Sequence, residues 1–327
     1  MHATEHYLAW TWQGHADPMS LRQERLSIPP LNDNEVLVRN VAIGLNPVDW
    51  KVLAGELVDW APGKVPGVDG AGVVEAVGAG VDRNWIGQRV AYHQSLAHEG
   101  SFAQYTVLNQ RVLMCVPDEL DLALAAALPC PGLTAWQALN KLPALPGASI
   151  LIGGAGGSVG GYLVQLAVAR QLEVTVLCNP RHFDALRQLG ASHCIAGPWS
   201  ADRDWQPHQR YAAVIDCIGS EHAELLVPSL RSNGHIVCIQ GRLPQWPNPA
   251  FGRALSLHEV ALGALHAHGD DQDWARLVHA GEAMLQSLAE GRLKAQPLRR
   301  ANFLELPAQL EALRQRDFSG KPVILID

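Results

Sequence analysis

The sequence lacks the features that mark several classes of protein. It has no run of lysine and arginine, and its net charge is −7, which argues against a surface that binds nucleic acid. No apolar stretch reaches the ~20 residues that a membrane-spanning helix needs. The N-terminus has neither the basic start nor the long apolar core of a signal peptide. We therefore expect a cytoplasmic protein that binds neither nucleic acid nor a membrane.

Cysteine is scarce and scattered. The six cysteines include no pair spaced as CxxC, the spacing of common zinc and dithiol motifs. Four of them lie in or beside apolar runs, where a reduced, buried thiol is expected. The chain also has no internal repeat and no low-complexity segment. Its 327 residues, of which 48% are hydrophobic and 17% charged, suffice for two domains that each have a core.

One glycine-rich stretch, residues 150–161, organises the middle of the chain. The apolar run Ile150–Gly153 leads into glycines, and apolar side chains then recur at helical spacing over Ser158–Arg170. A second apolar run, Val174–Cys178, follows at the distance that one βαβ unit requires. Glycines let such a turn approach a pyrophosphate, whose charge the N-terminus of the helix stabilises. The stretch predicts a dinucleotide-binding site rather than a merely structural turn.

The remaining chain shows two patterns of predicted secondary structure. From Tyr7 to about Val116, short β-like runs separated by glycine and proline indicate a partly closed barrel. Helix formers then fill Asp121–Leu128, a helix that Pro129 is expected to stop, and a second helix is expected over Thr134–Leu139. Beyond the glycine turn, apolar strands alternate with helices, which indicates a parallel sheet buried on both faces. A late helix and a last strand, which is expected to return to the first domain, complete the chain.

Five motifs follow one another along nearly the whole chain. They are Gly44–Lys51, Pro66–Gly72, Gly100–Ala103, Leu128–Ala135 and the glycine turn. In these motifs the chain resembles the medium-chain dehydrogenase/reductase superfamily, specifically its zinc-independent quinone oxidoreductase-like branch. The resemblance implies an α/β fold with two domains. A GroES-like, partly open β-barrel is expected over residues 1–125 and 269–327, and a Rossmann domain with a doubly wound parallel sheet over residues 126–268.

The resemblance also bears on metal binding. Zinc-dependent members of the superfamily hold the catalytic metal with Cys, His and Cys. The matching positions here are Asn46, Val68 and either Cys130 or Pro131. At best one thiol and one amide remain, and these cannot supply the three protein ligands of a catalytic zinc site. The cysteine-rich lobe that holds a structural zinc is missing too, so we predict no metal.

The end of the second Rossmann strand bears on the choice of cofactor. Sites that prefer NAD usually carry an acid there, ~20 residues past the glycines, to bind the ribose 2′-OH. Here the strand runs into Cys178-Asn179-Pro180-Arg181 without a carboxylate, and Arg181 suits a 2′-phosphate. The alternative is that Arg181 is a solvated residue of the next helix. We predict NADPH, bound by Gly154, Gly157, Ser158, Val159, Gly160, Asn179, Arg181, Cys217, Gln240 and Gly241.

Hydride transfer to a quinone or enone builds negative charge on the acceptor oxygen, and without a metal this charge needs fixed hydrogen-bond donors. Asn46 is the first candidate because the resemblance places it at a zinc-ligand position. The alternative is a turn residue before a proline. Thr134 is the next candidate, either in contact with the nicotinamide or as a helix N-cap. Trp50 is either an aromatic wall for a flat acceptor or a core tryptophan.

We therefore predict a zinc-independent oxidoreductase that transfers hydride from NADPH to a quinone or an α,β-unsaturated carbonyl. The alternatives are an enoyl-thioester reductase, which a tyrosine acid in the cleft would favour, and a non-catalytic NADPH-binding redox sensor. Tyr92 and His93 are expected to be structural, and Asp49 and Lys51 to face solvent. The proton is expected from water or an unidentified donor. The partner is a small electrophilic substrate, and the resemblance suggests a homodimer.

Overall fold

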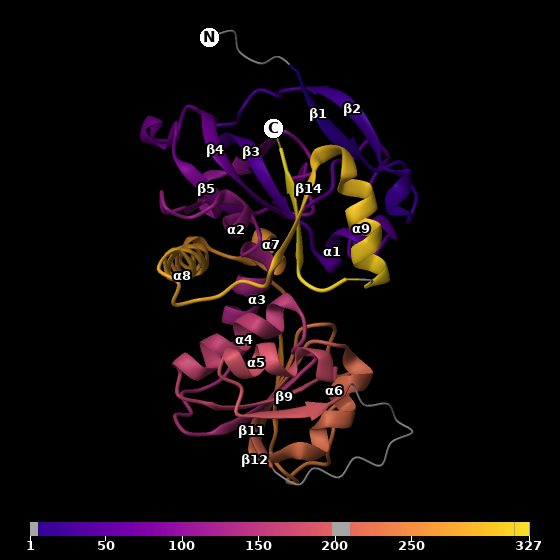
Figure 1. Cartoon of the computed structure of the whole chain (residues 1–327), viewed down its shortest axis with the longest axis vertical. Coiled ribbons are helices and arrows are strands. Elements are labelled where there is room, and N and C mark those ends of the chain that lie inside the picture. Colours follow the sequence, from indigo (N-terminus) through magenta and orange to yellow (C-terminus); the bar gives the residue numbers. More distant parts are fainter. Residues whose placement is uncertain (1–5, 198–209, 317, 327) are drawn as a thin grey trace. The chain divides into compact units, whose positions relative to one another are not determined.

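A computed structural model describes residues 6–197, 210–316 and 318–326 (Figure 1). The chain divides into two compact units: unit 1 runs up to Cys130 and resumes at Gly263, and unit 2 is Pro131–Leu262. The predicted division, after residues 125 and 268, differs from this one. One contact that ties Cys130 to unit 1 is the hydrogen bond from its backbone N–H to the Asp69 carboxylate.

Unit 1 is built on a seven-stranded sheet in the order β14-β15-β3-β4-β5-β7, with β6 paired to β3. Its strands are β3 (Glu35–Gly44), β4 (Asp69–Val77), β5 (Arg89–His93), β6 (Tyr105–Asn109), β7 (Met114–Cys115), β14 (Leu298–Asn302) and β15 (Lys321–Leu325). Every pair is antiparallel except β14–β15. A separate antiparallel pair joins β1 (His6–Thr11) to β2 (Arg22–Ser27). These are the indigo, purple and yellow strands of Figure 1.

The last strand returns to the first half of the chain, as predicted. β15 pairs with β3, so that Val323 lies opposite Gly44. Gly44 lies opposite Asp69 of β4, and Asp69 lies opposite His93 of β5. Cross-strand partners have their side chains on the same face of a sheet. Asp69 and His93 therefore lie side by side on one face of the sheet, in a row that crosses four strands.

Unit 1 also contains helices, some of which pack against this sheet. The helices of unit 1 are α1 (Pro47–Leu53), α2 (Leu122–Ala126), α7 (Ala264–His268), α8 (Asp271–Ala289) and α9 (Leu306–Gln315), with 3-10 turns η1 (Pro18–Ser20), η2 (Arg83–Trp85), η3 (Gln110–Val112) and η6 (Phe303–Glu305). α2 lies against β3 at Gly44, where an added Cβ would be 2.1 Å from the backbone oxygen of Ala126. α8 begins with a capping box between Asp270 and Asp273.

Unit 2 is a six-stranded parallel sheet in the order β10-β9-β8-β11-β12-β13, drawn in magenta to orange in Figure 1. Its strands are β8 (Ser149–Gly153), β9 (Glu173–Cys178), β10 (His193–Ala196), β11 (Tyr211–Asp216), β12 (Leu230–Cys238) and β13 (Ser256–Glu259). The helices that lie wholly within unit 2 are α4 (Ser158–Ala169), α5 (Phe183–Gln188) and α6 (Ser220–Leu226), with turns η4 (Pro180–His182) and η5 (Val227–Ser229). The central strands β8 and β11 are almost wholly apolar and buried, as expected for a sheet covered on both faces. The predicted α/β fold class is confirmed.

One predicted helix boundary is wrong. Pro129 was expected only to stop a helix, but α3 (Pro129–Asn140) begins at this proline, a few residues after α2 ends. A proline at the first helical position has no N–H to leave unpaired, and its fixed φ already suits a helix. Thr134 therefore lies inside α3 and is not a helix N-cap.

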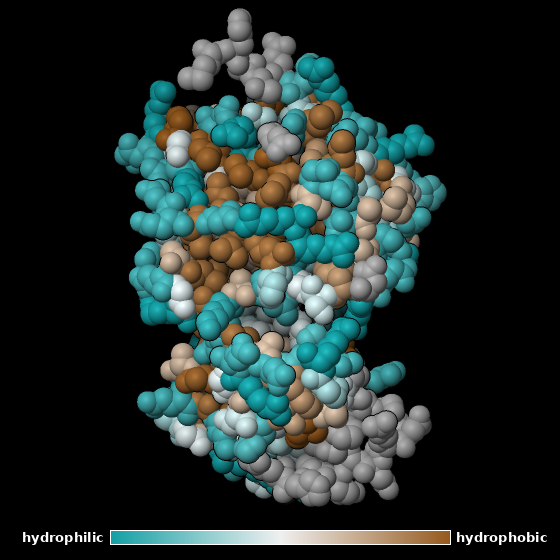
Figure 2. Space-filling view, in the orientation of Figure 1, coloured by the Kyte–Doolittle hydropathy of each residue, from teal (hydrophilic) through white to brown (hydrophobic). Residues whose placement is uncertain are grey.

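Unit 1 has hydrophobic side chains at its surface. They are the brown area that Figure 2 shows over strands β3 to β5. At the margin of the core of unit 1, Ala76 of β4 and Val107 of β6 are only partly buried. Of the helices in the described part of the chain, none is both long enough and apolar enough to cross a membrane.

Candidate functional site

The carboxyl ends of four parallel strands meet at one edge of the sheet in unit 2. Gly153 of β8 lies opposite Leu177 of β9 and Asp216 of β11, and Asp216 lies opposite Cys238 of β12. The chain runs outward from β8 to β10 and then returns to β11 on the other side of β8. In α/β sheets, ligands bind at this edge where the strand order reverses. The loops after these strands and the start of α4 carry the predicted cofactor residues Gly154, Gly157, Ser158, Val159, Gly160, Asn179, Arg181, Cys217, Gln240 and Gly241.

The glycine turn between β8 and α4 forms a cradle of backbone. Gly154 has φ +73°, a conformation that residues with a side chain rarely adopt. A Cβ on Gly160 would lie 2.2 Å from the backbone oxygen of Ala155, so only glycine lets α4 pack this closely on the turn. Gly157 is the N-cap of α4 and has no side chain to cover the N–H groups of its first turn. Such N–H groups stabilise phosphate, so the turn fits the pyrophosphate of a dinucleotide.

A buried acid holds the loop that follows β11 through hydrogen bonds. Asp216 is 1% exposed, and its Oδ2 accepts hydrogen bonds from the backbone N–H groups of Ile218 (3.0 Å) and Gly219 (2.8 Å). Its Oδ1 bonds to Nδ1 of the buried His222. The backbone N–H of Cys217 donates to Gly153 at 3.0 Å, which ties the loop to β8. Desolvation, and next the charge of Asp216, raise the pKa of the Cys217 thiol, which keeps it protonated.

Asp216 and His222 were not predicted from the sequence. An acid at the end of an otherwise apolar strand was the available signal, because a buried charge requires partners.

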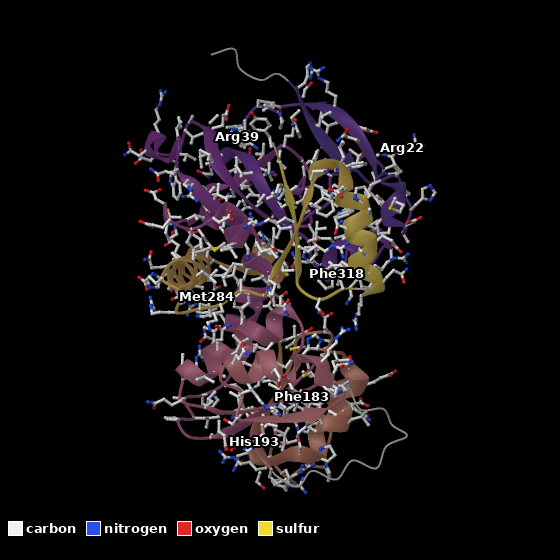
Figure 3. All side chains as sticks on the ribbon, in the orientation of Figure 1. Arg22, Arg39, Phe183, His193, Met284 and Phe318 are labelled. Atoms are coloured by element: carbon white, nitrogen blue, oxygen red, sulfur yellow. The ribbon has the colours of Figure 1, made fainter. Side chains whose placement is uncertain are left out.

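The end of β9 presents Arg181 beside this cradle. Asn179 caps η4, and its Oδ1 accepts a hydrogen bond from the Arg181 backbone N–H at 3.0 Å. The Arg181 side chain is exposed, and its Nε donates to Nε2 of His182 at 3.0 Å. Phe183, labelled in Figure 3, then begins α5. The loop carries a guanidinium where NAD-preferring sites carry an acid.

A buried polar cluster lies at the start of α1 in unit 1, around Asn46, which is 2% exposed. The Asn46 amide donates to Oδ2 of Asp69 at 2.8 Å and to the carbonyl of Gly44 at 3.2 Å. Its Oδ1 accepts from Nζ of Lys321 at 2.5 Å, and its backbone N–H donates to Oδ2 of Asp49 at 2.7 Å. Every polar atom of the Asn46 side chain is thus engaged within the protein.

The charged members of this cluster are also fully enclosed. Asp49 and Asp69 are 0% exposed and Lys321 is 4% exposed. The Asp69 carboxylate accepts the backbone N–H of Cys130 at 3.0 and 2.9 Å. Asp49 was expected to face solvent, and this expectation is wrong because the acid reaches back to the first residue of its own helix turn. Asp69 and Lys321 were not singled out, although a charged residue in an apolar strand marks both.

Burial sets the protonation of these groups. Desolvation raises the pKa of Asp49 to about 7 against the opposing hydrogen bond from Asn46. Desolvation likewise raises the pKa of Asp69 to about 7, while the charge of Lys321 pulls it down. Desolvation lowers the pKa of Lys321, and the nearby charge of Asp69 partly restores it. The lysine is the counter-charge of two enclosed carboxyl groups.

Comparison with known proteins assigns the family. The alcohol dehydrogenase GroES-like domain matches residues 32–118. The chain is 34% identical over 230 residues to the chloroplast envelope quinone oxidoreductase homolog of Arabidopsis thaliana, which covers 67% of this chain and 70% of that protein. The chain belongs to the medium-chain dehydrogenase/reductase superfamily, in its quinone oxidoreductase-like branch. The predicted family is therefore confirmed.

Two further comparisons agree with this membership. The oxidoreductase is 31% identical over 245 residues to the chloroplastic NADPH-dependent alkenal/one oxidoreductase of the same plant, over 71% of this chain and 62% of that protein. It superposes on the crystal structure of an alcohol dehydrogenase superfamily protein from Novosphingobium aromaticivorans with a TM-score of 0.85 and 26% identity, over 98% and 100% of the two chains. Membership implies a nicotinamide cofactor and a small-molecule substrate.

The zinc-ligand positions of this oxidoreductase hold no preformed metal site. Asn46 is engaged as described, Val68 is 1% exposed in the core, and Cys130 is half-buried. Over residues 6–197, 210–316 and 318–326, no group of three or more His, Cys, Asp or Glu side chains is arranged to hold a metal ion. The absence of zinc stays a prediction.

The other predicted catalytic residues fall into different units. Trp50 lies on α1 beside Asn46, where it is half-buried and packs against the core of unit 1. The Lys51 ammonium lies 5.8 Å from the centroid of the Trp50 ring. Thr134 belongs to unit 2 and is 8% exposed. The roles of all three residues stay predictions.

A pair of histidines occupies the end of the row that contains Asp69. His93 is 6% exposed, and its Nδ1 lies 3.2 Å from Nε2 of His266, with the two rings stacked at 5.4 Å. Trp274 packs on His266 at 4.8 Å, and Arg111 donates to the His266 carbonyl at 3.2 Å. Desolvation, followed by the neighbouring His266, lowers the pKa of His93 to about 3. Desolvation is also the main cause that lowers the pKa of His266 to about 4, so both rings are neutral at pH 7.

Proposed function

We propose that the protein is an NADPH-dependent oxidoreductase that reduces a quinone or an α,β-unsaturated carbonyl. The observation that carries the proposal is the cradle at the carboxyl edge of the unit 2 sheet, where the glycine turn and the Arg181 loop lie at the ends of adjacent strands. The names of the relatives support it, since they include a quinone oxidoreductase homolog and an NADPH-dependent alkenal/one oxidoreductase. When bound, the nicotinamide supplies a hydride.

The proposed preference for NADPH rests on Arg181. Its guanidinium is suited to a phosphate on the ribose 2′ position, and residues 179–182 contain no carboxylate that would select the 2′-OH. Because a hydrogen bond to a charged group contributes about 1.5–3 kcal/mol, Arg181→Ala should weaken NADP⁺ binding about tenfold or more. Binding of NAD⁺ should change less than twofold. Calorimetric titration with both dinucleotides measures this directly.

Arg187→Ala is the matched control, since Arg187 is an exposed arginine of the following helix that pairs with Asp184. It should leave both affinities unchanged. An Arg181→Ala protein that keeps the full preference for NADP⁺ would contradict the choice of cofactor.

Asn46 is the residue that we propose to meet the charge on the acceptor oxygen. Of its two donated hydrogen bonds, the one to the Gly44 carbonyl is the longer, so this hydrogen is the one that an acceptor oxygen can recruit. Asp69 and Lys321 fix the amide plane by holding its nitrogen and its oxygen. Trp50 and Thr134 are proposed to contact the acceptor and the nicotinamide.

Asn46→Ala should lower kcat by about a hundredfold, the usual effect of removing one such donor, and leave NADP⁺ affinity within threefold. Steady-state rates and NADP⁺ titration of the same preparation separate the two effects. Asn84→Ala, which changes an exposed asparagine of unit 1, controls for nonspecific loss. An unchanged kcat would remove Asn46 from the reaction.

The decisive assay follows the absorbance of NADPH and NADH with a panel of quinones, enals and an enoyl thioester. Turnover of quinones or enals with NADPH supports the proposal. Turnover of the thioester alone would favour an enoyl reductase, and NADPH binding with no turnover would favour a redox sensor. The tyrosines disfavour the enoyl reductase, because all five are at most 9% exposed and Tyr92 is bonded to Asn40 and Thr106. A homodimer and a cytoplasmic location stay predictions.

A further inference from the structure

His182 connects the two parts of the cofactor cradle. It is the last residue of η4, directly after Arg181, and its ring lies against Gly156 of the glycine turn. A Cβ on Gly156 would be 2.4 Å from Cδ2 and 2.9 Å from Nε2 of this ring. Only a glycine leaves room for the imidazole there. The loop after β9 and the turn after β8 are therefore in direct contact through His182.

The same ring determines how Arg181 is held. Nε of Arg181 donates to Nε2 of His182 at 3.0 Å, so one of the five guanidinium hydrogens is used within the protein. The Arg181 backbone is fixed independently, by the Asn179 cap and the proline that starts η4. Among the described residues, the two terminal nitrogens of the guanidinium have no hydrogen-bond partner. They form the edge that binds two oxygens of a phosphate side by side.

We propose that His182 is a positioning residue of the cofactor site, which holds Arg181 beside the glycine turn so that its terminal nitrogens meet the 2′-phosphate of NADPH. An arginine side chain on the surface normally samples many rotamers, and ordering it costs binding free energy. The bond to His182 orders this side chain before the cofactor arrives. The inference rests on the proposed use of NADPH and deepens it, because it assigns the discrimination between NADPH and NADH to a pair of residues.

The protonation of His182 is compatible with this role. To accept a hydrogen bond at Nε2, the ring must be neutral and carry its hydrogen on Nδ1. Desolvation, and then the charge of Arg181, lower the pKa of His182, which favours the neutral ring at pH 7. Burial, and next the charge of the arginine, thus favour the form of the histidine that accepts this hydrogen bond.

The test compares two substitutions by calorimetric titration with NADP⁺ and NAD⁺. His182→Phe keeps a flat ring but has no acceptor, and it should weaken NADP⁺ binding about tenfold, which is 1.4 kcal/mol, with NAD⁺ affinity within twofold. His182→Gln provides an amide oxygen that accepts from Arg181, and it should keep NADP⁺ affinity within threefold. The control is His193→Phe, which changes an exposed histidine on the edge strand β10, labelled in Figure 3.

A double variant tests whether His182 acts through Arg181. In the Arg181→Ala background, His182→Phe should cause no further loss of NADP⁺ affinity, because the side chain that it positions is already absent. Equal losses for NADP⁺ and NAD⁺ in His182→Phe, or additive losses in the double variant, would overturn the inference. If Arg181→Ala itself leaves the preference intact, the proposed choice of NADPH fails instead. If the unaltered protein binds neither dinucleotide, the proposed function fails.

Discussion

Lys321→Met should lower the free energy of unfolding by about 3–5 kcal/mol, the usual cost of removing one partner from a buried charge pair. Lys321 is 4% exposed and donates to Asn46, beside the fully enclosed Asp69 and Asp49. Methionine fills a similar volume, so the loss arises from charge rather than from a cavity. The carboxyl groups then lose their counter-charge, and Asn46 loses the donor to its Oδ1.

The expected loss depends on pH, which distinguishes it from a packing defect. Both carboxyl groups have pKa values raised to about 7, so each is mostly ionised at pH 8 and mostly protonated at pH 5.5. A protonated carboxyl group needs no counter-charge. Lys321→Met should therefore cost more at pH 8 than at pH 5.5, and the double variant Asp69→Asn/Lys321→Met should recover part of the loss at pH 8.

Urea unfolding at the two pH values, followed by circular dichroism, measures these differences. Lys294→Met, which changes an exposed lysine of unit 1, is the control and should be nearly neutral. A loss in Lys321→Met that is the same at both pH values would show that the charge of Lys321 is not what stabilises the cluster.

The polar cluster shows which part of the site was accessible from the sequence. Asn46 was identified because it stands in a motif of the family, so its position along the chain was sufficient. Its partners Asp69 and Lys321 were not, because the contact depends on strands β3, β4 and β15 meeting in one sheet. The last of these strands comes from the opposite end of the chain. Local hydrophobic patterns predict that a strand exists, but they do not specify which distant strand pairs with it.

More of the cofactor cradle could be predicted from the sequence, because its parts are consecutive in the chain. A strand, a glycine turn and a helix are consecutive in the chain, so their spacing alone indicated the geometry of Gly154 and Gly160. The following loop was predicted through the same unit, since Asn179 and Arg181 come directly after its second strand. His182 was not singled out, because its contact with Gly156 depends on how two loops meet in space, which no pattern of residue types encodes. The start of α3 at Pro129 was not predicted, because a proline that is unfavourable inside a helix is favourable at its first position.

Acid should destabilise the oxidoreductase through His93. The pKa of this ring is about 3 in the folded protein and about 6.5 in an unfolded chain, so between these values the unfolded state binds a proton that the folded state does not. Stability from this group is therefore present above pH 6.5 and is lost as the pH falls. The slope approaches about 1.4 kcal/mol per pH unit only below pH 6.5, so the loss between pH 6.5 and 4.5 is about 2 kcal/mol.

Two other groups act in the opposite direction, and the measurement must separate them. Asp49 and Asp69 have raised pKa values, so their folded forms take up protons first and their contribution to stability grows as the pH falls from 7 towards 4. The difference between the unfolding free energies of the unaltered protein and His93→Gln cancels this common term. Glutamine does not titrate, so the difference should change by about 2 kcal/mol between pH 6.5 and 4.5.

His268→Gln provides the matched control. His268 lies on α7, as does His266, the partner of His93, but it is exposed. The free energy of unfolding of the His268→Gln variant should equal that of the unaltered protein at every pH. A constant difference between the unaltered protein and His93→Gln would mean that His93 is protonated equally in both states. The stacked contact with His266 would then stabilise unit 1 by packing, and the acid sensitivity of the protein would have to arise from other groups.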